Sequence, residues 1–162
     1  NDPDYILIGW VGNAYKMGVG KKTTLTPNEQ YFYMSMWSLM AAPLIFSGDM
    51  AKLDLFTLNV LCNSEVIDVN QDPLGKQAKI LRQNVNEVIL VKDLQDGSKA
   101  IGLFNLSNDI SSIHLNWNEI NVSPKQKVRN LWQHKDLGEF EAQFVGKVPE
   151  HGVVMIRVEN VE

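Results

Sequence analysis

Apolar side chains recur at helical spacing near residue 35, and this pattern predicts a helix. The stripe consists of Tyr33, Met36, Trp37, Met40 and Ala41. Spacings of three and four residues place these side chains on one helical face, which can lie against a sheet. We therefore expect Trp37 to be buried in that contact, the usual outcome for a tryptophan in an apolar stripe.

Polar and turn residues predict where this helix begins and ends. Thr26 is a suitable N-cap, Pro27 suits the first helical position, and Glu29 stands where a capping box requires it. Pro43 lacks the N–H group that a continuing helix needs, so it is expected to stop the helix.

The segment 44–47 is apolar throughout and predicts a strand covered on both faces. A helix leading into such a strand is the repeating unit of an α/β barrel, whose active sites lie at the carboxyl ends of the strands. Asp49 follows the strand and would face that rim. Capping of a helix that begins near Met50 is nevertheless the better-supported role for Asp49.

Helical spacing returns in 50–62, through Leu53, Phe56, Val60 and Leu61. Cys62 closes this segment and is expected to be a buried small hydrophobe. The cluster of turn residues at 71–75 then suggests a boundary between residues 1–75 and residues 76–162.

Beyond residue 75 the apolar pattern changes to a period of two. The β-rich segments are 86–93, 99–106, 110–117, 127–133, 138–144 and 152–159. Asp96 and Gly97 supply a hairpin turn between the first two segments. Regular spacing of about a dozen residues is typical of an antiparallel sandwich, so residues 79–160 predict seven or eight such strands.

Composition narrows the possible partners. The 162 residues are 44% apolar and 21% charged, as in an ordinary globular chain. Residues 1–75 carry four Lys and Arg against eight Asp and Glu, and residues 76–162 carry eleven of each, so we expect no nucleic-acid partner. Neither a membrane-spanning window nor a signal peptide is recognisable, and we expect no membrane partner.

Cysteine and histidine usage argues against a metal centre. Cys62 is the only cysteine, so no internal disulfide can form. His114, His134 and His151 match no metal-ligand spacing. We expect neither a metal nor another cofactor.

Three motifs in order carry a resemblance to a known family. They are Asn1-Asp2-Pro3-Asp4, Leu39-Met40-Ala41-Ala42-Pro43-Leu44 and Asn70-Gln71-Asp72-Pro73-Leu74-Gly75-Lys76-Gln77. Together they resemble the C-terminal part of a glycoside hydrolase family 27 enzyme, the α-galactosidase and α-N-acetylgalactosaminidase family. The stretches 25–31 and 53–58 are more similar to bacterial and plant-type members than to animal ones. The resemblance covers the chain and fades after Gln77.

This resemblance implies a fold of the α/β plus all-β class. Residues 1–75 would supply the end of strand 7, helix 7, strand 8 and helix 8 of a (β/α)8 TIM barrel, and residues 76–162 an antiparallel β-sandwich. The missing N-terminal part of the barrel would be a partner of this chain. The resemblance implies a secreted or periplasmic location, although no targeting segment is recognisable in this chain.

The resemblance also implies a retaining hydrolase acting on a galactoside or related carbohydrate. Such enzymes use two carboxylates about 5 Å apart. In the family both precede the Asn-Asp-Pro-Asp motif, so no catalytic residue is expected in this chain, which alone should be inactive. Asp4 would hydrogen-bond a sugar hydroxyl, Tyr5 would occupy a pocket-lining position that is Met in animal members, and Trp10 could edge the pocket. Trp37, Trp117 and Trp132 are expected in packing roles instead.

Two alternatives remain open from the sequence. One is a non-catalytic carbohydrate-binding or structural module. The other is a family member acting on another sugar: an α-N-acetylgalactosaminide, a β-L-arabinopyranoside or an isomalto-oligosaccharide. Residues 1–75 favour a hydrolase, because a quarter of a barrel cannot bury its own strand faces.

Overall fold

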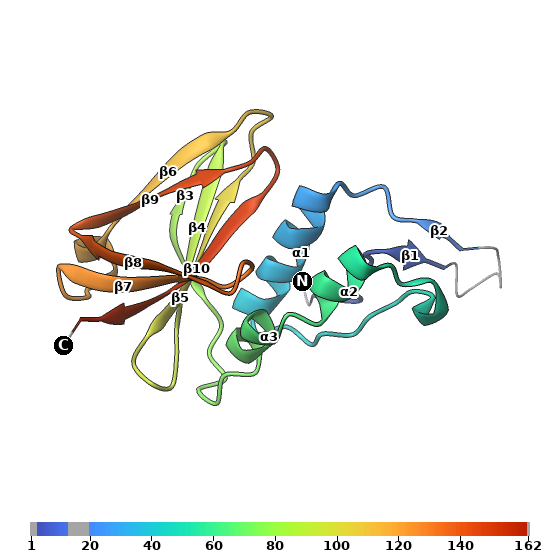
Figure 1. The fold of residues 1–162 in the computed structure, drawn as a ribbon, viewed down its shortest axis with the longest axis horizontal. Coiled ribbons are helices and arrows are strands. Elements are labelled where there is room, and N and C mark those ends of the chain that lie inside the picture. The colour runs from blue at the N-terminus through green and yellow to red at the C-terminus, as the bar shows by residue number, and fades with distance from the viewer. Residues whose placement is uncertain (1–2, 13–19, 162) are drawn as a thin grey trace.

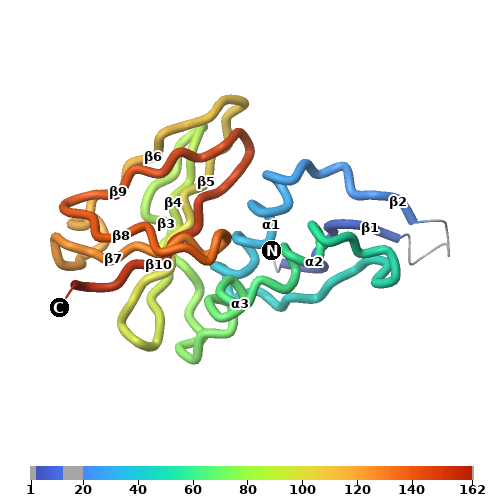
Figure 2. The backbone as a smooth tube through the Cα atoms, in the orientation of Figure 1, coloured from blue at the N-terminus to red at the C-terminus, as the bar shows by residue number. Residues whose placement is uncertain are grey.

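The computed structural model describes residues 3–12 and 20–161. A helical N-terminal part lies beside a β-sandwich, and helix α1 (Pro27–Leu39) lies between the sandwich and the region of β1 (Trp10–Val11), β2 (Lys21–Lys22) and α2 (Leu55–Leu61) (Figure 1). The backbone tube passes once from the N-terminal part into the sandwich, just after the last helix (Figure 2). Asn1, Asp2, residues 13–19 and Glu162 lie outside the described ranges.

Two short parallel segments form the centre of the N-terminal part. Ile6 donates its N–H to the Ile45 carbonyl (2.7 Å) and accepts from the Ser47 N–H (3.0 Å), which makes one parallel bridge between Ile6 and Phe46. Ile6 and Ile8 are buried, whereas Tyr5 is 50% exposed, Leu7 46% and Ile45 51%. The strand at 44–47 is therefore covered less completely than its sequence predicts, because it has one strand neighbour among the described residues.

Helix α1 begins as its sequence predicts. Thr26 Oγ1 accepts the Glu29 N–H at 3.3 Å, while Glu29 Oε2 accepts the Thr26 N–H at 2.7 Å, so the capping box is complete. The helix ends at Leu39, well before Pro43. The cause is Ala41, which adopts a left-handed conformation (φ 51°) that lets its neighbour Ala42 donate back to the Trp37 carbonyl at 3.0 Å.

The packed face of α1 differs from the predicted one. The buried side chains are Gln30, Met34, Ser35, Ser38 and Leu39. The predicted stripe of Tyr33, Met36, Trp37 and Met40 is only half-buried and lines open hollows. Met34 and Leu39 enter the core, the small side chains of Ser35 and Ser38 are buried beside them, and the larger side chains of the predicted stripe line the hollows.

The single helix predicted over 50–62 is divided in two. A 3₁₀ turn spans Met50–Lys52 and α2 spans Leu55–Leu61. Asp49 caps the turn by accepting the Ala51 N–H at 3.0 Å, and Asp54 caps α2 by accepting the Thr57 N–H at 2.8 Å. The capping role predicted for Asp49 is confirmed.

Cys62, expected to be buried, is exposed at the end of α2. Asn63 then caps a third helix, α3 (Ser64–Asn70), by accepting the Val66 N–H at 3.0 Å. Val66 and Val69 are the buried apolar side chains of α3.

The C-terminal part is an antiparallel sandwich of eight strands in the described chain, in agreement with the sequence. The strands are β3 (Lys79–Gln83), β4 (Glu87–Asp93), β5 (Lys99–Asn105), β6 (Ser111–Asn116), β7 (Lys125–Asn130), β8 (Lys135–Glu141), β9 (Gln143–Val148) and β10 (Val153–Asn160). The larger sheet has the order β3-β4-β5-β10-β7-β8, and β6 pairs with β9 in the second sheet. Trp117 is fully buried between the layers and donates to the Phe140 carbonyl at 3.1 Å.

The two parts share one apolar core, so α1 and α3 pack directly on the sandwich. Ile6 and Leu39 belong to the same buried cluster as Phe104 and Met155. Trp132, predicted in a strand, lies in the turn after β7 and donates its indole N–H to Ser35 of α1 at 2.8 Å. The predicted boundary at residue 75 lies in the turn before β3. The division of the chain into two domains at this point stays a prediction.

No helix in the described ranges is both long enough and apolar enough to cross a membrane.

Candidate functional site

Asp4 and Tyr5 lie together on the surface, beside the C-terminal half of α1. They line a hollow of 430 Å³ together with Pro3, Leu7, Tyr33, Trp37 and Met40. Asp4 is exposed, and its Oδ1 accepts the Tyr5 N–H at 2.9 Å. Its Oδ2 accepts no hydrogen bond from the part of the chain that the structure describes, so one carboxylate oxygen is available to a ligand.

Two aromatic side chains of α1 hold the backbone at this position. Trp37 donates its indole N–H to the Asp4 carbonyl at 2.9 Å, and Tyr33 donates its hydroxyl to the Tyr5 carbonyl at 2.7 Å. The two rings meet edge to face, with centroids 4.1 Å apart. The apolar pattern predicts only a packing role for Trp37 and does not indicate these bonds. The sequence signal for these bonds is a Tyr and a Trp four residues apart on one helix, each with a hydrogen-bond donor at the end of its side chain.

Trp10 lies in a different hollow, so the three residues proposed for sugar contact are not brought together. That hollow has a volume of 180 Å³ and is lined by Gly9, Lys22, Lys52 and Asp54 among others. The Lys52 ammonium lies 4.5 Å from the centre of the Trp10 ring, and the Trp10 carbonyl accepts the Asp49 N–H at 2.9 Å. One face of the indole is therefore already in contact with a cation, an arrangement that favours packing over sugar stacking.

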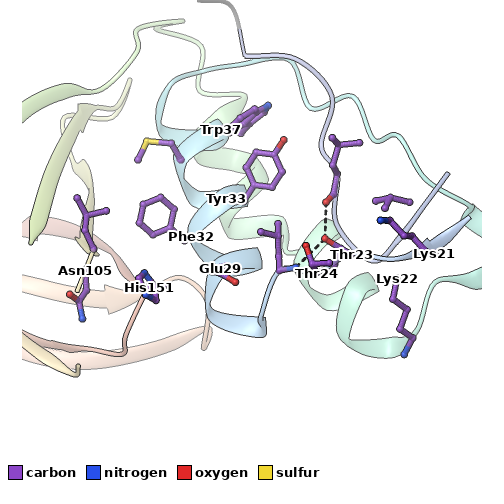
Figure 3. Close-up of a pocket in the computed structure, with 15 residues that line it drawn as sticks. Lys21, Lys22, Thr23, Thr24, Glu29, Phe32, Tyr33, Trp37, Asn105 and His151 are labelled. Atoms are coloured by element: carbon purple, nitrogen blue, oxygen red, sulfur yellow. Dashed lines mark hydrogen bonds between the residues drawn. The ribbon is translucent and has the colours of Figure 1, made fainter. Parts of the chain in front are cut away.

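A larger hollow of 620 Å³ follows the outward face of α1 (Figure 3). Phe32, Tyr33, Met36 and Trp37 line it from the helix, and Leu7 lines it from the parallel segment. Asn105 and His151 of the sandwich close one end, while Lys21 and Lys22 lie at the other (Figure 3). Asp4 does not line this hollow, which is a large apolar surface with few polar groups.

Two further acidic residues, Asp72 and Glu65, have structural partners. Asp72 accepts the Leu74 N–H at 3.1 Å and the Gln95 N–H at 3.0 Å, so it fixes the turn before the sandwich. Glu65 of α3 accepts two hydrogen bonds from Arg129 (2.6 and 2.9 Å), which hold the pKa of the Glu65 carboxyl below its usual value. Within the described ranges, no group of three or more His, Cys, Asp and Glu side chains is arranged to hold a metal ion.

Two family models match consecutive parts of the chain. The model described as alpha galactosidase A matches residues 1–72, and the model described as alpha galactosidase C-terminal beta sandwich domain matches residues 86–158. The first range covers the helical part, and the second covers the sandwich from β4 to β10 without β3. Parts of a carbohydrate-hydrolysing enzyme are thus recognised on both sides of the turn at 71–75.

Known proteins resemble the chain over nearly its whole length. "Probable alpha-galactosidase" from Dictyostelium discoideum is 35% identical over 96% of this chain and 39% of its own length. Alpha-galactosidase 3 from Arabidopsis thaliana is 33% identical over 88% of this chain and 32% of its own length. A GH27 β-L-arabinopyranosidase from Geobacillus stearothermophilus has a TM-score of 0.90 at 25% identity, covering 99% of this chain and 37% of its own.

The chain belongs to glycoside hydrolase family 27. It spans between 32% and 39% of the length of these relatives.

Proposed function

We propose that this chain is the C-terminal segment of a retaining, exo-acting α-galactosidase-like glycoside hydrolase. The observation that carries the proposal is its identity of 33% to 35% with proteins named α-galactosidases, over 88% to 96% of the chain. The exposed carboxylate of Asp4 adds chemical support. In this proposal the chain contributes part of the sugar pocket and a sandwich that supports the barrel.

The two catalytic carboxylates would come from barrel strands that precede residue 1. A retaining glycosidase uses one carboxylate as nucleophile and the other as acid and base, about 5 Å apart. Family resemblance assigns neither role to this chain, and its carboxylates Asp49, Asp54 and Asp72 are occupied in capping or turn contacts. The isolated chain should therefore show no turnover.

Asp4 would act as a binding group for the sugar. Its Oδ2 can accept a hydrogen bond from a sugar hydroxyl, while Oδ1 stays bonded to the Tyr5 N–H. Hydrogen bonds to an ionised carboxylate are about twice as strong as neutral ones, which suits recognition of an uncharged polyol. Tyr5, half exposed beside it, would line the same pocket. Trp10 would at most edge the pocket, since Lys52 covers one face of its ring.

The missing N-terminal part of the barrel would cover the apolar surfaces left open here. Tyr5, Leu7 and Ile45 are about half exposed, although strands of a closed barrel are buried on both faces. The hollow along α1, lined by Phe32 and Met36, has the apolar character expected of a contact with a neighbouring barrel helix.

The test is an assay of the complete gene product on an aryl α-galactoside, with Asp4→Ala as the companion variant. We expect turnover by the wild-type enzyme and a loss of at least tenfold in kcat/KM for the variant, since a charge-assisted hydrogen bond contributes about 1.5–3 kcal/mol. Failure to cleave any aryl glycoside would favour a non-catalytic carbohydrate-binding or structural module.

A β-L-arabinopyranoside is the second candidate substrate. The structural similarity to the Geobacillus β-L-arabinopyranosidase favours it. The two sugars share the arrangement of their ring hydroxyls, and galactose carries an additional hydroxymethyl group at C5. Comparing kcat/KM for the two aryl glycosides would decide between them, and an aryl α-N-acetylgalactosaminide and an isomalto-oligosaccharide complete the panel.

A further inference from the structure

Asp4 and Tyr5 are fixed to helix α1 rather than to a neighbouring strand. The parallel pairing of this segment starts at Ile6, which bonds to the Ile45 carbonyl and the Ser47 N–H. Before Ile6, the carbonyls of Asp4 and Tyr5 accept hydrogen bonds from Trp37 and Tyr33 of α1. Among the described residues, these two side chains are the donors to the two carbonyls.

The two aromatic side chains act together in holding the backbone of Asp4 and Tyr5. They stand four residues apart on one helical face, and their rings contact edge to face with an interplanar angle of 87°. Each ring restricts the rotamers of the other, so the two donors are held in place before any ligand arrives. The helix itself is anchored by its complete capping box at Thr26 and Glu29.

We propose that Trp37 and Tyr33 are positioning residues for sugar binding, which hold the carboxylate of Asp4 in its productive place through its backbone. An aspartate side chain is short, so the location of its carboxylate follows that of its own backbone. A binding group fixed in advance loses less conformational entropy when the sugar binds. This proposal rests on the proposed sugar contact of Asp4 and deepens it.

Both donors keep their protons across the neutral range. The indole N–H of Trp37 does not ionise, and burial raises the pKa of the Tyr33 hydroxyl above its ordinary value. These two hydrogen bonds are therefore independent of pH across the neutral range.

The test uses Trp37→Phe and Tyr33→Phe in the complete gene product. Each change removes one donor and keeps an aromatic ring. Trp132→Phe is the matched control, because it removes an indole N–H bond of similar length (2.8 Å) to Ser35 of the same helix, away from Asp4. KM, kcat and melting temperature are measured for each variant on the aryl glycoside that the wild-type enzyme cleaves.

We expect Trp37→Phe to raise KM about three- to tenfold, the range that corresponds to one lost hydrogen bond. Tyr33→Phe should act in the same direction, and Trp132→Phe should lower the melting temperature with KM unchanged. Placing Trp37→Phe in an Asp4→Asn background should produce little further rise in KM, because the group that Trp37 positions is already impaired.

Other results would overturn the proposal. Equal KM values for Trp37→Phe and Trp132→Phe, with Asp4→Asn impaired, would remove the positioning role and leave the sugar role of Asp4 intact. A full effect of Trp37→Phe in the Asp4→Asn background would show that Trp37 does not act through Asp4. Unchanged kinetics in Asp4→Asn alone would overturn the sugar contact of Asp4 and the positioning role with it.

Discussion

Lys92 in strand β4 donates a hydrogen bond from its ammonium group to the carbonyl of Val69, at the end of α3, over 2.5 Å. The lysine side chain is completely buried, and it connects the sandwich to the last turn of a helix. A cation at a helix C-terminus interacts favourably with the helix dipole, which offsets part of the cost of burying the charge.

The stability contribution of Lys92 should depend on pH. Burial lowers the pKa of Lys92 below its ordinary value of 10.5, so the unfolded chain keeps this proton at pH values where the folded chain releases it. Stability should therefore rise with pH from the lowered pKa to about 10.5. Urea unfolding of wild type and Lys92→Met at pH 7 and pH 9.5 measures this, and the wild type should gain relative to the variant. An equal change in both proteins would contradict the prediction.

Truncating the same side chain gives a second test. Lys92→Ala should lower the free energy of unfolding by about 2–4 kcal/mol, because the buried stem leaves a cavity. Lys92→Met should lie within about 1 kcal/mol of wild type at pH 7, since the apolar chain fills the space and loss of the buried charge offsets loss of the hydrogen bond. Equal losses in the two variants would show that the ammonium contact outweighs the packing.

Glu65 should stabilise the junction between α3 and β7 only while it is ionised. Its hydrogen bonds from Arg129 lower its pKa, so its contribution is present above the unfolded pKa of about 4.5 and is lost as the pH falls through the folded pKa. Glu65→Gln should reduce the melting temperature at pH 7. At acidic pH the melting temperatures of the variant and the wild type should become equal. Asp68→Asn, at an exposed position of the same helix, is the control and should change little. A constant deficit of Glu65→Gln across the pH range would contradict this mechanism.

Asn105 is a buried connector inside the sandwich. Its amide group donates to the carbonyls of Asp109 (2.7 Å), Val148 (3.2 Å) and Pro149 (3.0 Å), and its carbonyl oxygen accepts from Ser107. Asn105→Ala should cost about 2–3 kcal/mol of unfolding free energy, because buried carbonyls lose their donor.

Asn105→Asp should cost more, since an ionised oxygen would face the same carbonyls. Asn59→Ala, at an exposed position of α2, is the control for replacing an asparagine. Chemical denaturation compares the three variants, and a cost below about 0.5 kcal/mol for Asn105→Ala, the usual range for surface changes, would contradict the connecting role.

The outward face of α1 provides a test of barrel assembly. Met36→Glu places a charge in the apolar hollow and should sharply reduce the yield of soluble, active gene product if the rest of the barrel packs there. Val85→Glu changes a side chain that is 87% exposed on the sandwich and should leave the yield unchanged. A normal yield and activity for Met36→Glu would place the missing part of the barrel elsewhere.

Local features of the fold were predictable from the sequence. The capping box depends on the four consecutive residues from Thr26 to Glu29, and the sandwich strands depend on alternation within single segments. Both kinds of feature are set by neighbours in sequence. The end of α1 was placed too late because Ala41 adopts a left-handed conformation that its residue type does not announce.

Features that depend on tertiary packing were less accessible. The apolar stripe of Tyr33 and Trp37 was recognised, but periodicity does not say which neighbour a face meets, and the small side chains Ser35 and Ser38 took the close contacts. Asp4 was selected by family resemblance. The hydrogen bonds that fix its backbone could not be predicted, because they join the segment before Ile6 to a helix about thirty residues further along the chain.

Strand β10 lies between β5 and β7, although it is formed by residues 153–160. During synthesis, the six-stranded sheet cannot form until this strand has left the ribosome. The edge of β5 that pairs with β10 stays unpaired while some fifty residues are added. Met155 and Phe104, which belong to the same core cluster beside α1, therefore come together only after β10 has been made. The helices that depend on this core are made before the sandwich and gain this contact only after β10 is in place.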